Sequence, residues 1–280
     1  ITIPDSVTSI GGSAFQSCSN LSSITIGDSV TSIEDYAFSA CTSLESITIP
    51  NSVTSIEGGA FYDCTDLESI TIPNSVTSIE GGAFYDCTDL ESITIPDSVT
   101  SIGDNTFNGC TNLSSITIGN SVTSIKRGAF YDCTDLESIT IPDSVISIGN
   151  EAFSGCTSLT SLTYEGDAPT FGTDVFQYSN SVTVYYYDDA TGFTSPTWQG
   201  IQSEAISRPA AIIAGIEKLE VGVNLWFNAT SGQSHRIESS NDLENWTMLE
   251  DEIVSEDDTV IRYYDTVGIQ KRFYRVKRND

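Results

Sequence analysis

Basic residues, histidine and long apolar runs are all scarce in this chain of 280 residues. It has 11 lysines and arginines against 39 acidic residues, which gives a net charge of −28. A surface of this sign repels the phosphates of nucleic acids and of anionic lipids, so neither is expected as a partner. No apolar run approaches the roughly 20 residues that span a bilayer, so no membrane-spanning segment is expected either.

A single histidine, His235, restricts the catalytic chemistry that the sequence supports. Nucleophilic sites built on serine or cysteine usually need a histidine base, and His235 lies on a predicted strand outside the region that holds every cysteine. Phosphate-binding glycine loops and zinc-ligand spacings are also missing. The acidic run between Glu250 and Asp258 is interpreted as a solvated loop in preference to a cation site. The sequence therefore predicts no enzyme, no metal site and no cofactor.

What the chain does have is an internal repeat of 23 residues. A degenerate eighth copy begins at Leu162, and residues 45–67 and 68–90 are identical, which indicates recent duplication of the unit. The seven regular copies start at Ile1, Ile24, Ile47, Ile70, Ile93, Ile116 and Ile139.

Each repeat is expected to form one turn of a solenoid. In Ser69–Ile72 the alternation places the isoleucines inside and Ser and Thr outside, as in a half-exposed strand. Pro73–Asn74 ends the strand. A second short extended segment carries Val76 and Ile79 inward, and Ala83–Cys87 is expected to form one helical turn. Because one unit cannot bury its apolar face alone, stacked copies are needed to make a continuous core.

This pattern resembles the BspA-like leucine-rich repeats of bacterial and protist surface proteins. The residues that carry the resemblance in one copy are Leu67, Ile70, Ile72, Val76, Ile79, Ala83, Phe84 and Cys87. The resemblance implies a leucine-rich-repeat solenoid of short parallel strands and helical turns over residues 1–161, used for adhesion or ligand binding at a cell surface. Residues 162–205 are expected to form a degenerate repeat and an aromatic-rich C-terminal cap.

The cysteines occur once per repeat, at the same position: Cys18, Cys41, Cys64, Cys87, Cys110, Cys133 and Cys156. Their odd number excludes complete pairing within one chain. In-register neighbours one strand spacing apart, about 4.8 Å, are too distant for the usual disulfide geometry, and a straight column cannot supply a tetrahedral metal site. We therefore interpret them as small buried apolar side chains.

Two columns of outward-facing hydroxyls run along the predicted strands. They fit either a recognition surface for a protein, a glycan, or a mineral or ice surface, or simply the strand preference of threonine. The candidate binding face consists of Ser69, Thr71, Ser92, Thr94, Ser115, Thr117, Ser138 and Thr140.

Two further columns lie outside this face. Tyr62, Tyr85 and Tyr131 form a candidate stripe on the convex turns, as a contact surface or as rings half-buried beside phenylalanine. The Asp and Asn residues that follow each strand, such as Asp5 and Asp97, are interpreted as turn residues in preference to a calcium ladder, because one side chain per turn does not supply six to eight converging oxygens.

Residues 206–280 are predicted to form a separate small antiparallel β-sandwich. The charge is nearly balanced there, with 13 of the acidic and nine of the basic residues, and five alternating runs are separated by Gly, Asn and Asp turns. The segments 232–249 and 272–276 resemble C-terminal β-domains appended to large secreted bacterial proteins. This second resemblance implies secretion.

The combined expectation is a non-enzymatic extracellular or cell-surface module that binds a protein or glycan. The alternative is a structural subunit of a fibre or sheath that self-associates end to end through an uncapped N-terminal edge at Ile1. A third possibility is an accessory carbohydrate-binding part of a larger enzyme encoded upstream. Ile1 falls on a repeat boundary, so the chain is interpreted as a mature or trimmed fragment.

Overall fold

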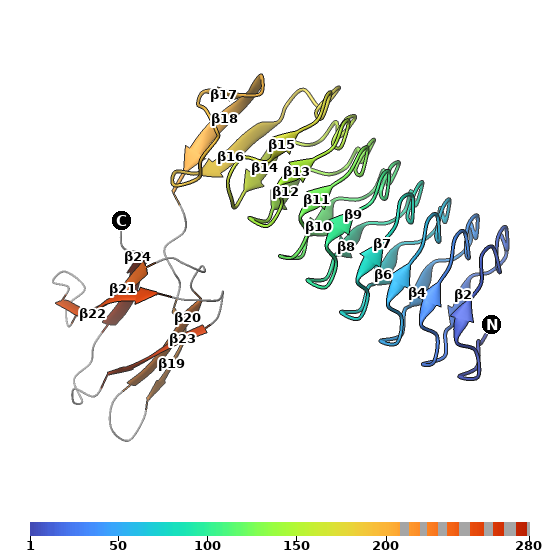
Figure 1. Cartoon of the computed structure of the whole chain (residues 1–280), viewed down its shortest axis with the longest axis horizontal. Helices are drawn as coiled ribbons and strands as arrows, with labels where there is room; N and C mark the ends of the chain where they lie inside the picture. The colour runs from blue at the N-terminus through green and yellow to red at the C-terminus, as the bar shows by residue number, and fades with distance from the viewer. Residues whose placement is uncertain are drawn as a thin grey trace. The chain divides into compact units, whose positions relative to one another are not determined.

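Stacked turns of parallel strands form the N-terminal unit of the computed structural model (Figure 1). The structure describes residues 1–207 and, beyond them, the backbone of six strands. The chain divides into two compact units, Ile1–Ile206 and Ser207–Asp280. The predicted solenoid of parallel strands is confirmed. Within the described residues no helix could cross a membrane.

One side of the solenoid carries the strands that the Ile-Thr-Ile segments form and, after them, the strands of the last three turns. They are β2 (Ser23–Thr25), β4 (Ser46–Thr48), β6 (Ser69–Thr71), β8 (Ser92–Thr94), β10 (Ser115–Thr117), β12 (Ser138–Ile141), β14 (Ser161–Tyr164), β16 (Thr183–Tyr187) and β18 (Ile201–Ile206). Each repeat pairs with the equivalent residues of its neighbour, as in Ser46↔Ser69 and Ile47↔Ile70. Because of this register, residues that recur every 23 positions in the sequence lie in columns along the solenoid.

A second, continuous sheet carries the other extended segment of each repeat. Its eight strands, in spatial order, are β1 (Ser9–Ile10), β3 (Ser32–Ile33), β5 (Ser55–Ile56), β7 (Ser78–Ile79), β9 (Ser101–Ile102), β11 (Ser124–Ile125), β13 (Ser147–Ile148) and β15 (Thr170–Phe171). The inward residue of β3, Ile33, is fully buried, as is Val53 before β5. Both faces of the solenoid therefore enclose one apolar core.

A stack of phenylalanine rings runs through this core. Neighbouring rings are nearly parallel, with centroids 5.2 Å apart between Phe15 and Phe38 and 5.7 Å apart between Phe153 and Phe176. Such contacts add about 0.5–1.5 kcal/mol per pair beyond the burial of apolar area. The stack consists of Phe15, Phe38, Phe61, Phe84, Phe107, Phe130, Phe153 and Phe176.

The predicted helical turn at the Ala-Phe-x-x-Cys segment is wrong. Its backbone N–H groups alternate between two kinds of partner: Phe84 donates to Thr106 in the next turn, and Tyr85 donates to Gly82 three residues back. Gly82 and Asp86 also have positive φ angles of 65° and 55°. A helix needs negative φ throughout and donation along its own axis. Bonding between turns therefore replaces the helix.

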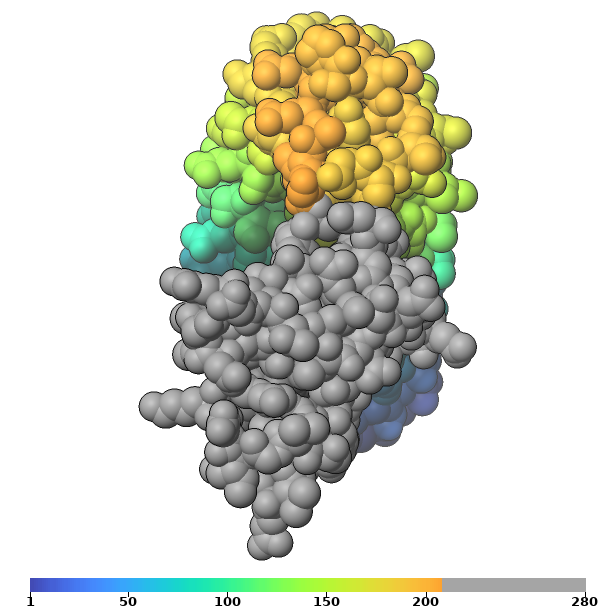
Figure 2. Space-filling model, turned by 90° about the vertical axis from the view of Figure 1, so that its left-hand side faces the viewer, coloured from blue at the N-terminus to red at the C-terminus, as the bar shows by residue number. Residues whose placement is uncertain are grey.

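The last turns change from repeat to closure. The chain adds β17 (Thr197–Trp198), which pairs antiparallel with β18. The Phe193 ring stacks on Tyr186 with centroids 4.6 Å apart, and the Trp198 indole donates to the carbonyl of Gly192. Figure 2 views the stack from this end, with these residues (orange) in front of the earlier turns. Aromatic side chains thus cover the final apolar layer.

The C-terminal unit contains two three-stranded antiparallel sheets. One has the order β19 (Ile213–Lys218), β20 (Val223–Asn228), β23 (Val260–Asp265), and the other β22 (Thr247–Val254), β21 (Ser234–Ser240), β24 (Phe273–Arg278). Five of these strands overlap the predicted alternating runs, and β19 was missed. The packing of the sheets into a sandwich stays a prediction. The side chains of His235 and the acidic run near Glu250 lie outside the described residues.

Six of the seven cysteines are buried, as predicted, and Cys18 in the first turn is exposed. The sequence did not indicate their hydrogen bond: the Cys87 thiol donates to the carbonyl of Phe61 at 3.1 Å, and each buried thiol repeats this contact. Burial raises the pKa of the Cys41 thiol to about 11 and that of Cys87 well above its usual value. The reactive thiolate is therefore suppressed in the core.

We predict that only one thiol of the folded chain, that of Cys18, reacts rapidly with Ellman's reagent at pH 8. The other six have raised pKa values or no access to solvent, so they should react only when denaturant unfolds the solenoid. The Cys18→Ser variant should lose the fast phase and keep six slow thiols. A fast-reacting thiol in that variant would contradict the buried column.

Tyr164 gives a second prediction about stability. Its hydroxyl is buried and has no hydrogen-bond partner among the described residues, while its ring contacts Phe193 and Trp198. The Tyr164→Phe variant should therefore raise the free energy of unfolding by about 1 kcal/mol, because it removes an unsatisfied polar group and keeps the ring. Tyr164→Leu is the control and should lower it. Urea denaturation measures both, and a destabilised Phe variant would show that the hydroxyl is hydrogen-bonded.

Candidate functional site

The candidate binding face lies on the outer side of the β2–β12 strands. In each strand the central isoleucine points into the core while the flanking Ser and Thr are exposed, as in β6 and β8. All eight predicted residues are exposed to solvent: Ser69, Thr71, Ser92, Thr94, Ser115, Thr117, Ser138 and Thr140. We call this set the hydroxyl face.

The hydroxyls of this face differ from the other hydroxyl columns in their bonding. Thr88 and Thr111, at the edge of the turn, each donate a side-chain hydrogen bond to the backbone of the preceding turn. Thr54 and Thr77 do the same on the other side of the solenoid. Within residues 1–207, no side-chain hydrogen bond engages the hydroxyls of the hydroxyl face. They are available to a ligand, whereas these threonine columns hold the turns together.

The sheet beneath the hydroxyl face is interrupted once. Strands β2 to β10 form one hydrogen-bonded sheet, β12 to β18 belong to another, and β10 is not paired with β12. At this place Ile116 is only partly buried, whereas the equivalent Ile93 and Ile139 are 4% and 3% exposed. We call the gap between β10 and β12 the open junction.

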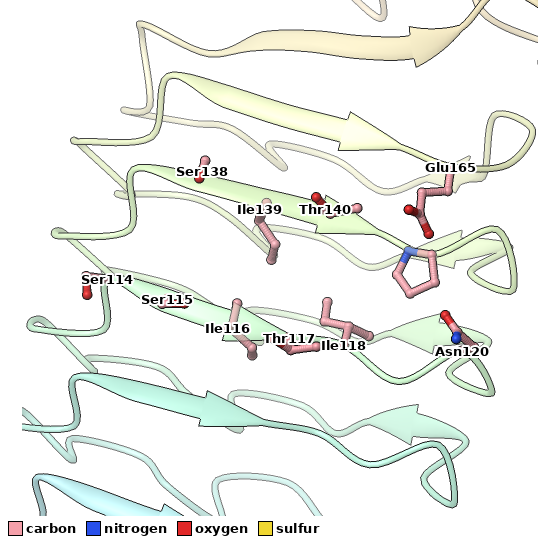
Figure 3. Close-up of a pocket in the computed structure, with 11 residues that line it drawn as sticks. Ser114, Ser115, Ile116, Thr117, Ile118, Asn120, Ser138, Ile139, Thr140 and Glu165 are labelled. Atoms are coloured by element: carbon pink, nitrogen blue, oxygen red, sulfur yellow. The ribbon is translucent and has the colours of Figure 1, made fainter. Parts of the chain in front are cut away.

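A groove of about 410 Å³ lies over the open junction (Figure 3). Four residues of the hydroxyl face line it: Ser115, Thr117, Ser138 and Thr140. Ile116 and Ile139 lie between them in Figure 3, and Asn120 and Glu165 lie at the end of the groove nearest the strand termini. The volume falls within the range of about 300–1,000 Å³ that is typical of small-molecule sites.

The turn that follows β10 leaves extra room at this groove. Gly119 stands where the neighbouring turns have Pro96 and Pro142, both of which are buried. A Cβ at Gly119 would lie 2.6 Å from the backbone of Pro96, so the glycine lets this turn lie close to the preceding one. In the turn after Pro142 the equivalent position holds Glu165, which also lines the groove.

The tyrosine stripe is divided in the structure. The rings of Tyr62 and Tyr85 stack with centroids 4.7 Å apart, and both are half-buried. The exposed ring of Tyr36, which the sequence did not indicate, extends this pair with its centroid 6.5 Å from that of Tyr62. Asn108 replaces the tyrosine in the next turn and separates Tyr131 from these rings, and the charge of Asp132, and secondarily burial, raises the pKa of Tyr131. The role of the stripe as a contact surface stays a prediction.

The Asp and Asn column contributes to stacking. The Asp5 carboxylate accepts the backbone N–H of Asp28 at 3.0 Å, and Asp97 accepts that of Asn120 at 2.7 Å. These bonds join one turn to the next, whereas the sequence indicated bonds within a turn. Among the described residues, no group of three or more His, Cys, Asp or Glu side chains could hold a metal ion.

Sequence reasoning placed the hydroxyl face but missed the groove and three of its residues. Ser114, Asn120 and Glu165 line it together with the predicted hydroxyls. A signal was present in the alignment of the repeats, because Ser114 replaces the glutamate found at Glu91 and Glu137. The interruption of the sheet itself has no marker in the sequence.

The family model that matches the chain is the BspA type leucine rich repeat region, in six copies over residues 1–100 and 77–203. The search of proteins with curated functions gives no match. Among solved structures, a leucine-rich repeat protein from Bacteroides ovatus is 31% identical, with a TM-score of 0.57 over 72% of this chain and 59% of that one.

Two other bacterial structures are similar. A leucine rich cell surface protein from Faecalibacterium prausnitzii is 30% identical, with a TM-score of 0.53 over 72% of this chain and 65% of its own. The leucine-rich repeat protein of T. pallidum is 32% identical, with a TM-score of 0.53 over 56% of this chain and 77% of its own. The chain thus spans less than two thirds of the B. ovatus and F. prausnitzii proteins. With the repeat columns and parallel turns described above, these matches show that the chain belongs to the BspA type leucine-rich repeat family.

Proposed function

We propose that this chain is a non-enzymatic binding module, exposed outside the cell, which attaches to a protein or glycan through its hydroxyl face. The observation that carries the proposal is the bonding of the hydroxyls. Those of the hydroxyl face are exposed and unbonded in the described structure, while the threonine hydroxyls of two other columns, as at Thr77 and Thr88, join one turn to the next. A rigid array of free donors and acceptors suits a polar partner.

The rest of the solenoid supports this assignment. The strands hold the array on a continuous backbone, so little conformational entropy is lost when a partner binds. The extended face of stacked repeats is the surface that such proteins generally use for recognition. The similar protein from F. prausnitzii is described as a cell surface protein, which favours the same location for this chain.

Lysine substitutions on the hydroxyl face should abolish binding without unfolding the solenoid. The triple variant Thr71→Lys, Thr94→Lys, Thr117→Lys places three long charged side chains across the face while the buried isoleucines stay unchanged. We expect binding to a printed array of glycans and extracellular-matrix proteins to fall by about tenfold or more, equivalent to about 1.4 kcal/mol. Circular dichroism should show an unchanged fold.

The control variant is Thr54→Lys, Thr77→Lys, Thr100→Lys. It adds the same three charges at exposed positions just before β5, β7 and β9, on the other sheet. Its array binding should stay within about twofold of the unmodified chain. Equal losses in both variants would mean that net charge, and not the hydroxyl face, controls attachment. Unchanged binding in the first variant would remove this face as the contact surface.

A further inference from the structure

The open junction coincides with the longest part of the solenoid that carries no acidic residue; the next longest is residues 6–27 in the first turn. Residues 105–131 contain no Asp or Glu, although residues 1–205 hold 26 of the 39 acidic residues of the chain. We call residues 105–131 the acid-free segment. It includes β10 and supplies one side of the groove.

The acid-free segment arises by replacement at equivalent positions. Gly109, Asn112 and Ser114 stand where the preceding turn has Asp86, Asp89 and Glu91. Asn120 likewise replaces Asp97. One turn has thus lost its carboxylates around its circumference, and it is the turn whose strand ends the first sheet.

The absence of carboxylates restricts the charge of the ligand. A cationic ligand would be attracted to the acidic turns in preference to this one. An anionic ligand would need lysine or arginine, and neither lines the groove. Lys126 and Arg127 belong to the acid-free segment, but they follow β11 on the other sheet, and Arg127 is paired with Glu151. A neutral ligand favours a surface without carboxylates, because covering a charged group without pairing it carries a large desolvation penalty. The acid-free segment therefore fits an uncharged partner.

The groove lining restricts the chemistry further. Serine and threonine hydroxyls and the Asn120 amide both donate and accept hydrogen bonds, so they match a ligand rich in hydroxyls. Between them, the partly exposed Ile116 offers an apolar floor, as the C–H face of a sugar ring requires. The lining holds one carboxylate, that of Glu165, which lies outside the acid-free segment at one end of the groove.

We propose that the open junction is a subsite for a neutral oligosaccharide, held by Ser115, Thr117, Ser138, Thr140 and Asn120 over Ile116. This inference rests on the proposed function, because it assigns a ligand class to one part of the hydroxyl face. It also divides that face into a binding subsite at β10–β12 and a surrounding surface of regular turns that extends the contact.

The test uses the full chain and four uncharged disaccharides: cellobiose, maltose, lactose and N,N′-diacetylchitobiose. Saturation-transfer NMR should show contact with at least one of them, and titration calorimetry should give its affinity. The double variant Ser114→Glu, Asn120→Asp restores the acids of the neighbouring turns and should weaken that affinity by about tenfold or more. The pair Thr117→Val, Thr140→Val removes two hydroxyls and should weaken it similarly.

Matched controls come from the repeat itself. Ser22→Glu, Asn51→Asp adds two acids in the same two columns, away from the groove. Thr77→Val, Thr100→Val removes two exposed hydroxyls just before β7 and β9, on the other sheet and outside the hydroxyl face. Both should bind the disaccharide within about twofold of the unmodified chain. Thermal unfolding should show that all four variants are folded.

Three results would overturn the subsite: no contact with any of the disaccharides, equal losses in the groove and control variants, or tighter binding of tetralysine or sialyllactose than of every neutral sugar. None of these results concerns the array measurements on the lysine variants. If the first lysine variant loses array binding while the disaccharides fail, the hydroxyl face stands as the contact surface and only the oligosaccharide subsite is rejected.

Discussion

In-register stacking at a spacing of 23 residues is the constraint on which the rest of this structure depends. A turn this small cannot bury its own apolar residues, and half of its backbone groups point along the stack. Both needs are met only when each residue lies against its equivalent in the next turn, as Phe84 donates to Thr106 and Thr77 donates to Thr54. The same bonding prevents a helix on the third side, since alternate N–H groups are already committed to the neighbouring turn.

In-register stacking places each side chain against the equivalent side chain of the next turn. This contact is favourable for some residue types and unfavourable for others. Phenylalanine and isoleucine gain contact area, and threonine and cysteine donate to the preceding backbone. Carboxylates repel one another: burial, and secondarily the charge of Asp63, raises the pKa of Asp86 in the next turn. Glycine relieves this at two places. A Cβ at Gly109 would lie 2.0 Å from the Asp86 carboxylate, and one at Gly155 would lie 1.9 Å from that of Asp132. The departures from the repeat are therefore partly set by the charge that the repeat accumulates.

Period and alternation were sufficient to predict the columns, because they depend only on which residues recur. Ile70 and Ile72 point inward, Ser69 and Thr71 point outward, and Cys87 is buried, all as the pattern indicates. The predictions that were wrong or missing concern contacts between neighbouring turns, which the sequence of a single turn does not determine. The Ala-Phe-x-x-Cys segment has the spacing of a helical turn, and only the partner turn reveals that its N–H groups bond elsewhere. The open junction depends likewise on how two different turns fit, with Gly119 on one side and Pro142 on the other.

A perfectly regular solenoid could bind a ligand but would not fix the position of the ligand along the stack of turns. Residues 45–67 and 68–90 are identical, so any ligand that binds one turn binds the next equally well, and its position along the face is undetermined. Regular turns supply area, rigidity and avidity for a repetitive partner. A ligand can be held at one position along the face only by a turn that differs from its neighbours. The turn of β10 differs in charge, in the burial of Ile116 and in its pairing, and the three differences occur together. On the proposed function, duplication can therefore lengthen the contact face freely, while the turn of β10 sets where a ligand is fixed upon it.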